Sequence, residues 1–275
     1  MLEEQIDVRI REKEAHLPLI DRPLMWHDEF TDKLWKDKPA FHDKVHISSV
    51  EQSALAYLNR GVESDPLSLE NSVKVWNENH PESKIRAGEL GEAIVWVIRC
   101  HDLGNIMGSI EVTDFGELRP KFFDRYRAKN AEPRSQRIAQ VLLENSDHDE
   151  EKKAHFIPFV RHMIGESKYM MTDEQSPFAL FMRVVDQIGN DLFSNNEQRV
   201  FGLLEEMLGE NPNATFVPYN FMNFTRIRFP QLLPDEDLRQ QLLKVWGKPL
   251  PPEQPNHSIE EILIADYLEK HDENE

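Results

Sequence analysis

The sequence predicts an all-α fold. Apolar residues recur three and four positions apart in several segments, as in Ile47, Val50 and Ala54, which is the spacing of one helix face. Glycine, proline and capping residues separate these segments. Almost no segment alternates between apolar and polar residues as a half-buried strand does. The most apolar segment, 93–107, is therefore expected to form a buried helix that ends near Asn105.

The same spacing gives the limits of the other elements. Helices are expected over residues 1–16, 46–58, 135–146, 155–164, 177–193, 200–208 and 235–246, and over a last segment that Ser258 opens with a capping box. Residues 17–44 are expected to form an irregular arm that packs onto the body through Trp26. Residues 62–87 are rich in turn residues and are expected to be an insertion. Pro158 is expected near the first turn of its helix, where proline is tolerated.

The composition is that of a folded domain with an acidic surface. Hydrophobic residues make up 39% of the 275 residues and charged residues 30%, which leaves enough apolar material for a core. The formal net charge of −18 disfavours broad binding of nucleic acids, because their phosphate backbones are also negative. A small phosphorylated ligand remains compatible with this charge, since a bound metal ion reverses the local field.

Cysteine and targeting signals are nearly absent. The single cysteine, Cys100, permits no intrachain disulfide and no cysteine-based zinc site, and it fits a reducing compartment. The N-terminal 16 residues are charged and lack the apolar core of a signal peptide. No apolar stretch approaches the length that spans a bilayer. We therefore expect a cytoplasmic protein with no membrane partner, and the exposed N-terminal helix and aromatic C-terminal arm are compatible with a homodimer.

The dipeptide His-Asp occurs five times, and one copy differs from the rest. The pairs at 27–28, 42–43, 148–149 and 271–272 lie in polar surroundings and are expected to be solvated surface pairs. The pair His101-Asp102 instead closes the most apolar helix of the chain. A charged group at the end of a buried helix costs several kcal/mol unless a partner compensates it. This pair is therefore the candidate for chemistry.

Two further residues can join this pair. His46 opens an amphipathic helix upstream, and Asp186 lies on a helix that is otherwise apolar, in the stretch FMRVVDQIGND. Two imidazole nitrogens and two carboxylate oxygens form a ligand set for a divalent transition metal, with positions left for water and substrate. Such an ion acidifies water to make a nucleophile and polarises a phosphoryl oxygen.

This ordered set resembles the HD-domain superfamily of metal-dependent phosphohydrolases. The family pattern has a histidine near the start of a helix, a His-Asp pair at the end of an apolar helix and a later aspartate after apolar residues. These positions fall on His46, His101-Asp102 and Asp186, and the resemblance covers roughly residues 40–195. It implies a helical bundle, with the long gap before His101 explained by the insertion at 62–87.

The resemblance also divides the chain. We expect residues 1–39 to form an N-terminal helix and packing arm, and residues 40–195 to form the HD domain. We expect residues 196–248 to form a C-terminal helical and aromatic extension, and residues 249–275 to form a linker and an acidic terminal helix.

Several assignments stay open from the sequence. His42 competes with His46 for the first ligand position, although it precedes the amphipathic run. His162 is either an active-site residue or a histidine favoured by the helix dipole. Asn105 either orients the metal centre or caps the helix. Cys100 is expected to be a small core residue.

The resemblance implies the function that we expect. It is the hydrolysis of a small phosphate ester, such as a nucleotide, by a metal-activated water. His46, His101, Asp102 and Asp186 would hold a divalent ion (Mn, Fe, Co, Zn, Ni or Mg), with Asp102, Asn105 and His162 in catalysis. Cationic side chains such as Arg161, Lys168 and Arg183 could meet the phosphate. The alternatives are a mixed-valent di-iron oxygenase on the same fold and a non-catalytic HD-fold binding protein.

Overall fold

The computed structural model of the chain describes residues 10–30, 41–60, 65–123, 127, 129–167, 177–194 and 223–253. Helices make up most of this part. They are α2 (Arg22–Phe30), α3 (Lys44–Leu58), α4 (Leu69–Asn79), α5 (Leu90–Cys100), α6 (Leu103–Ile106), α7 (Ala131–Glu144), α8 (Glu150–Gly165), α9 (Pro177–Arg183), α10 (Asn190–Ser194), α12 (Phe224–Leu232) and α13 (Glu236–Trp246), with short turns η1 (Leu19–Asp21) and η2 (Pro81–Ser83) and a π-helical segment η3 (Val184–Gly189). The prediction of a predominantly helical fold is confirmed.

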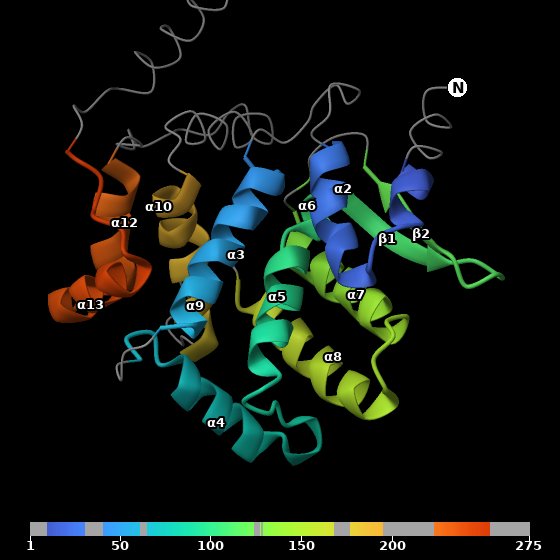
Figure 1. The fold of residues 1–275 in the computed structure, drawn as a ribbon, viewed down its shortest axis with the longest axis horizontal. Coiled ribbons are helices and arrows are strands. Elements are labelled where there is room, and N and C mark those ends of the chain that lie inside the picture. Colours follow the sequence, from blue (N-terminus) through green and yellow to red (C-terminus); the bar gives the residue numbers. More distant parts are fainter. Residues whose placement is uncertain are drawn as a thin grey trace, which may run out of the picture.

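The helices pack around a central pair, α3 and α5, which lie side by side (Figure 1). Helices α7 and α8 pack against α5, and the run α9–η3–α10 packs against α3. The C-terminal helices α12 and α13 lie outside that run, where α13 contacts α3 and α12 contacts η3. The core is lined by large apolar side chains such as Trp96, Phe159 and Phe181, all almost fully buried. None of the described helices is both long enough and apolar enough to cross a lipid bilayer.

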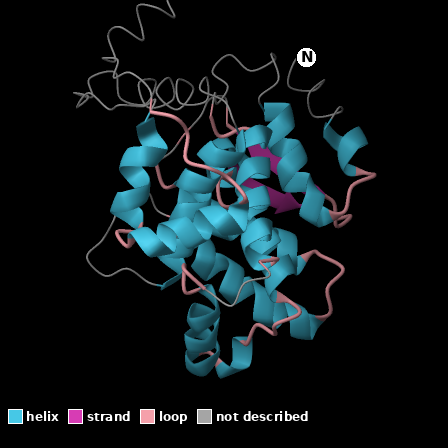
Figure 2. Ribbon diagram, turned by 60° about the vertical axis from the view of Figure 1, so that its left-hand side comes forward, coloured by secondary structure: helices cyan, strands magenta, loops and turns pink. Residues whose placement is uncertain are grey.

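A two-stranded antiparallel hairpin is the exception to the all-α prediction (Figure 2). Strands β1 (Met107–Val112) and β2 (Leu118–Phe122) pair Ile110 with Pro120 and Val112 with Leu118. The burial of β1 does not alternate residue by residue, so the sequence carries no clear strand signal. Pro120 cannot donate a ladder hydrogen bond, which fits an edge position.

Other expected boundaries need correction. The arm at 17–44 contains helix α2, in which Trp26 is fully buried as expected and its indole donates to Glu14 at 2.6 Å. The insertion at 62–87 contains helix α4. Helix α8 begins at Glu150, five residues before the expected start, because Asp149 caps it by accepting a hydrogen bond from the Lys152 amide. Pro158 therefore lies inside the helix.

Four further predicted helices are present in the structure, and two others lie outside the described residues. The predicted helices 46–58, 135–146, 177–193 and 235–246 are present, the last with Asp235 as its N-cap and Gly247 at a positive φ after its end. The predicted helices at 200–208 and from Ser258 lie outside the described residues.

Ser53 and Gly189 set the distance between α3 and η3. The Ser53 hydroxyl lies 3.1 Å from the Val50 carbonyl oxygen and 3.2 Å from that of Val185. A π-helical turn widens the backbone and leaves carbonyls without their usual α-helical partner. The Ser53 hydroxyl satisfies one of them. Gly189 faces the same serine so closely that a Cβ there would overlap its side chain.

We expect Gly189→Ala to lower the free energy of unfolding by about 1–3 kcal/mol, because the added methyl group overpacks the contact with Ser53. The measurement is chemical denaturation. Gly91→Ala is the control, since nothing lies within 4 Å of a Cβ at that helical position. A Gly189→Ala protein as stable as the Gly91→Ala protein would contradict the close contact.

We expect Asp191→Asn to stabilise the protein at pH 8 by about 1–3 kcal/mol. Burial raises the pKa of Asp191 from 3.8 to about 6. The folded state therefore holds a proton that the unfolded chain has already lost, and stability falls as the pH rises between these two values. Unfolding free energies of both proteins measured at pH 4 and pH 8 test this. An equal difference at both pH values would refute it.

Candidate metal centre

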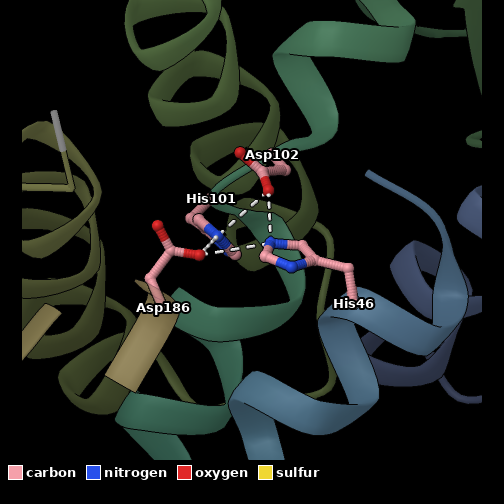
Figure 3. A group of neighbouring side chains, drawn as sticks. All are labelled: His46, His101, Asp102 and Asp186. Carbon is pink, nitrogen blue, oxygen red and sulfur yellow. Dashed lines mark hydrogen bonds and ion pairs between the residues drawn. The ribbon is translucent and has the colours of Figure 1, made fainter. Parts of the chain in front are cut away.

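The four predicted ligands come together where three separate elements meet (Figure 3). His46 lies in the first turn of α3, His101 and Asp102 form the turn between α5 and α6, and Asp186 lies in η3. One ligand atom of each residue lies within 4.8 Å of the ligand atoms of the other three. His46 and Asp186 are 140 residues apart in the sequence, and the packing of α3 against η3 brings them together.

Local sequence explains how each ligand is presented. The side chain of Asp43 caps α3 by accepting a hydrogen bond from the His46 amide at 2.9 Å. The helix expected to run to Asn105 instead ends at Cys100, and a short second helix begins at Leu103. The His101-Asp102 pair therefore occupies a break in the backbone, which lets both side chains face α3.

The histidines and carboxylates contact one another directly. His46 Nε2 lies 3.0 Å from Asp102 Oδ2 and 3.2 Å from Asp186 Oδ1. His101 Nε2 lies 3.1 Å and 3.5 Å from the same two oxygens. The imidazoles are almost completely buried, whereas the side chains of Asp102 and Asp186 are 14% and 20% exposed. The exposed part of the cluster therefore belongs to the two carboxylates.

His101 has the tautomer that a metal ligand requires. Its Nδ1 lies 2.6 Å from the carbonyl oxygen of Ile98 and donates to it, so the lone pair of neutral His101 is on Nε2. That Nε2 is buried and makes no hydrogen bond within the described part of the chain. In neutral His101 this Nε2 faces two carboxylate oxygens, which are acceptors like itself, so a proton or a metal ion between them would satisfy all three atoms. The residues present therefore fit a divalent metal ion.

Asn105 holds the Asp102 carboxylate. Its Nδ2 donates to Asp102 Oδ1 at 3.1 Å, while Oδ2 of the same carboxylate faces the two histidines. Asn105 is buried, and its own Oδ1 has no hydrogen-bond partner among the described residues. Of the two roles that the sequence left open, this geometry favours orienting a ligand.

The opposite charges of the imidazoles and carboxylates shift the pKa values of all four residues more strongly than burial does. Burial by itself raises the pKa of Asp186, but the imidazoles of His101 and His46, which face its Oδ1 at 3.5 and 3.2 Å, outweigh burial and hold that pKa at about 2. Burial likewise raises the pKa of Asp102, and the nearby His101 and His42 lower it well below its usual range. The pKa values of His46 and His101 are raised, because the two carboxylates outweigh the effect of burial. Protons therefore compete with a metal ion for the histidines.

Two further histidines lie beside the site: His42, which the sequence left as an alternative to His46, and His27, which it did not assign to the site. His42 Nε2 is 3.9 Å from Asp102 Oδ2, so His42 neighbours the cluster although it is not one of the four ligands. His27 is fully buried, and its Nδ1 donates to the His42 carbonyl oxygen at 3.0 Å. Burial lowers the pKa of His27 to about 4. The expectation that pairs 27–28 and 42–43 are solvated is therefore wrong for both histidines. For His27, the adjacent Trp26, a large apolar residue expected to pack onto the body, could have indicated burial in the sequence.

The structure does not bring His162 into the cluster. His162 lies near the end of α8, with Nε2 3.9 Å from Glu166 and its ring 5.0 Å from that of Trp76. Of the cationic candidates, Arg161 is exposed on the same helix, Arg183 is buried beside η3, and Lys168 lies outside the described residues. Cys100 is fully buried, and burial raises its pKa far above its ordinary value, in agreement with a core role.

No protein-family model, curated protein or solved structure matches this chain. The assignment of the metal centre therefore depends on the geometry of its residues.

We expect a divalent ion to stabilise the protein, by about 2.7 kcal/mol at a concentration of one hundred times its Kd. Asp186→Asn should remove most of this gain, whereas Asp191→Asn, which changes a carboxylate five residues further along, should keep it. Affinity should be weaker at pH 6 than at pH 8, because the histidines must lose their protons to bind the ion. Thermal unfolding with each ion tests this. Equal ion-dependent stabilisation in both variants would exclude Asp186 as a ligand.

Proposed function

We propose that this chain is an HD-type metal-dependent phosphohydrolase that acts on a small phosphate ester such as a nucleotide. The observation that carries the proposal is the convergence of His46, His101, Asp102 and Asp186 in one buried cluster. These are the residues on which the order of the HD pattern falls. Their chemistry, two neutral nitrogens and two carboxylates, suits a borderline divalent ion.

The residues of the chain have separable roles in this proposal. His46 and His101 would supply nitrogen ligands, and the carbonyl of Ile98 fixes the ring of His101 in the ligating tautomer. Asp102 and Asp186 would supply oxygen ligands, and Asn105 is a positioning residue for Asp102. When bound, a divalent ion lowers the pKa of water and polarises a phosphoryl oxygen. The partial exposure of the two carboxylates gives the substrate its approach.

The oxygenase alternative requires a second set of metal ligands. Within the described residues, one group of three or more histidine, cysteine or acidic side chains has ligand atoms close enough to share an ion. His162, the candidate for a second set, neighbours Trp76, Glu166 and Phe178 instead. These observations favour the phosphohydrolase with a mononuclear centre.

Asp102→Ala should abolish both metal content and turnover, because Asp102 contacts both histidines and its loss removes one of the two carboxylate ligands, leaving Asp186 as the one carboxylate of the cluster. Asp28→Ala is the matched control, since it alters an exposed aspartate in another His-Asp pair and should leave both properties unchanged. The assay is a panel of nucleotides and phosphomonoesters with Mn, Fe, Co, Zn, Ni or Mg, run beside elemental analysis.

Three outcomes would contradict the proposal. Retained turnover in a metal-free Asp102→Ala protein would remove the metal mechanism. Two irons per chain with dioxygen-dependent activity would establish the oxygenase. A silent panel with every ion would support a non-catalytic binding protein.

A further inference from the structure

A third imidazole lies beside the carboxylate oxygen that both histidine ligands face. His42 Nε2 is 3.9 Å from Asp102 Oδ2. The same oxygen lies 3.0 Å from His46 Nε2 and 3.1 Å from His101 Nε2. The rings of His42 and His46 meet edge to face, with their centroids 5.4 Å apart. A separation of 3.9 Å is too long for a hydrogen bond, and His42 is not one of the four side chains whose ligand atoms converge. His42 therefore adjoins the metal centre without belonging to its ligand set.

The exposure of His42 sets it apart from the two histidine ligands. Its side chain is 16% exposed, close to the values of the carboxylates Asp102 and Asp186, which are 14% and 20% exposed. The side chains of His46 and His101 are only 1% and 2% exposed. A molecule bound at the exposed carboxylates can therefore contact the ring of His42, whereas the rings of the two ligands are enclosed.

Hydrogen bonds hold the backbone on which His42 is mounted. The ring of His27, which belongs to α2 and is fully buried, donates from Nδ1 to the His42 carbonyl oxygen at 3.0 Å. The Asp43 amide donates to the Phe41 carbonyl oxygen at 2.8 Å, and the Asp43 side chain caps α3. A side chain on a backbone that is fixed in this way needs little reordering when it binds a ligand.

His27 makes this contact at the expense of its other nitrogen. Its Nε2 is buried and has no hydrogen-bond partner among the described residues. A buried polar atom that stays unsatisfied costs about 1–3 kcal/mol. Folded proteins tolerate such local costs mainly where a functional site requires them. The placement of His42 beside the metal centre is a requirement of this kind.

Phosphate chemistry at the centre leaves a role for a nitrogen donor outside the ligand set. A divalent ion would balance the two carboxylates and would use Nε2 of His46 and His101. The phosphoryl oxygens that do not face the ion then need N–H donors. A neutral imidazole has one N–H donor and a protonated imidazole has two. The partly exposed ring of His42, next to Asp102, is placed to provide one.

We propose that His42 donates a hydrogen bond to a phosphoryl oxygen of the substrate bound at the metal centre, and that His27 is a positioning residue for His42. This inference rests on the proposed function for the identity of the ligand. It makes His42 a substrate-binding residue, in place of the alternative first metal ligand that the sequence allowed.

The test is calorimetric titration of inorganic phosphate into the full-length protein loaded with the divalent ion that stabilises it most. His42→Ala should weaken phosphate binding about tenfold or more, because a hydrogen bond to a charged group is lost. His42→Gln should restore most of the binding, since its amide nitrogen reaches the place of Nε2, whereas the shorter amide of His42→Asn should not. All three variants should bind the ion as the wild type does. His16→Ala, which removes an exposed histidine elsewhere, is the control and should leave phosphate binding unchanged.

The role of His27 has its own pair of variants. His27→Phe keeps a ring but removes the donor to the His42 carbonyl, and it should weaken phosphate binding without changing the affinity for the ion. His27→Asn should restore phosphate binding, because its amide nitrogen takes the place of Nδ1. Equal phosphate affinity in these two variants would refute the positioning role.

The outcomes separate this inference from the proposed function. Equal phosphate affinity of the wild type and His42→Ala would overturn the contact even if the loaded enzyme hydrolyses phosphate esters. A loss of ion affinity in His42→Ala as large as that in Asp186→Asn would also overturn it, because His42 would then be a metal ligand. Phosphate binding that depends on His42, in a protein that hydrolyses nothing in the panel, would keep the contact and refute the phosphohydrolase.

Discussion

The structure depends on one constraint, the burial of two carboxylates beside two imidazoles. Charged groups that lose their hydration are stable in a core only when opposite charges and hydrogen bonds compensate them. His46, His101, Asp102 and Asp186 compensate one another over 3.0 to 3.5 Å. This is possible only if α3, the turn after α5 and η3 approach closely. The same compensation makes the cluster a ligand set, because a divalent ion can replace the protons that the histidines hold.

The close approach is secured by contacts away from the ligands. Arg99, two residues before His101, donates to both carboxylate oxygens of Glu51 on α3, at 2.6 and 2.9 Å. Ser53 on α3 binds the Val185 carbonyl of the π-helical turn, next to Asp186. The indole of Trp246 on α13 donates to the Ser53 carbonyl at 2.9 Å. The C-terminal helices therefore support the elements that carry the ligands: Trp246 of α13 bonds to α3, and Arg228 of α12 bonds to η3.

Different segments of the chain surround the two carboxylates of the cluster. His42 Nε2 lies 3.9 Å from Asp102 Oδ2, and the buried His27 ring donates a hydrogen bond to the His42 carbonyl oxygen. Gln187, the residue after Asp186, accepts a hydrogen bond from Arg228 of α12. N-terminal and C-terminal segments therefore both contribute polar groups beside the cluster.

The sequence by itself determined the helical character of the chain and the four residues of the cluster, because helical periodicity and an isolated polar pair in an apolar run are local signals. It did not determine the hairpin β1–β2, whose strands do not alternate in burial, nor the burial of His27, which depends on contacts made by distant segments. Only the tertiary structure decided that His46 faces both carboxylates, that His162 lies outside the cluster, and that Arg228 meets Gln187. Such pairings across 41 to 140 residues of sequence follow from helix packing, which no local pattern encodes.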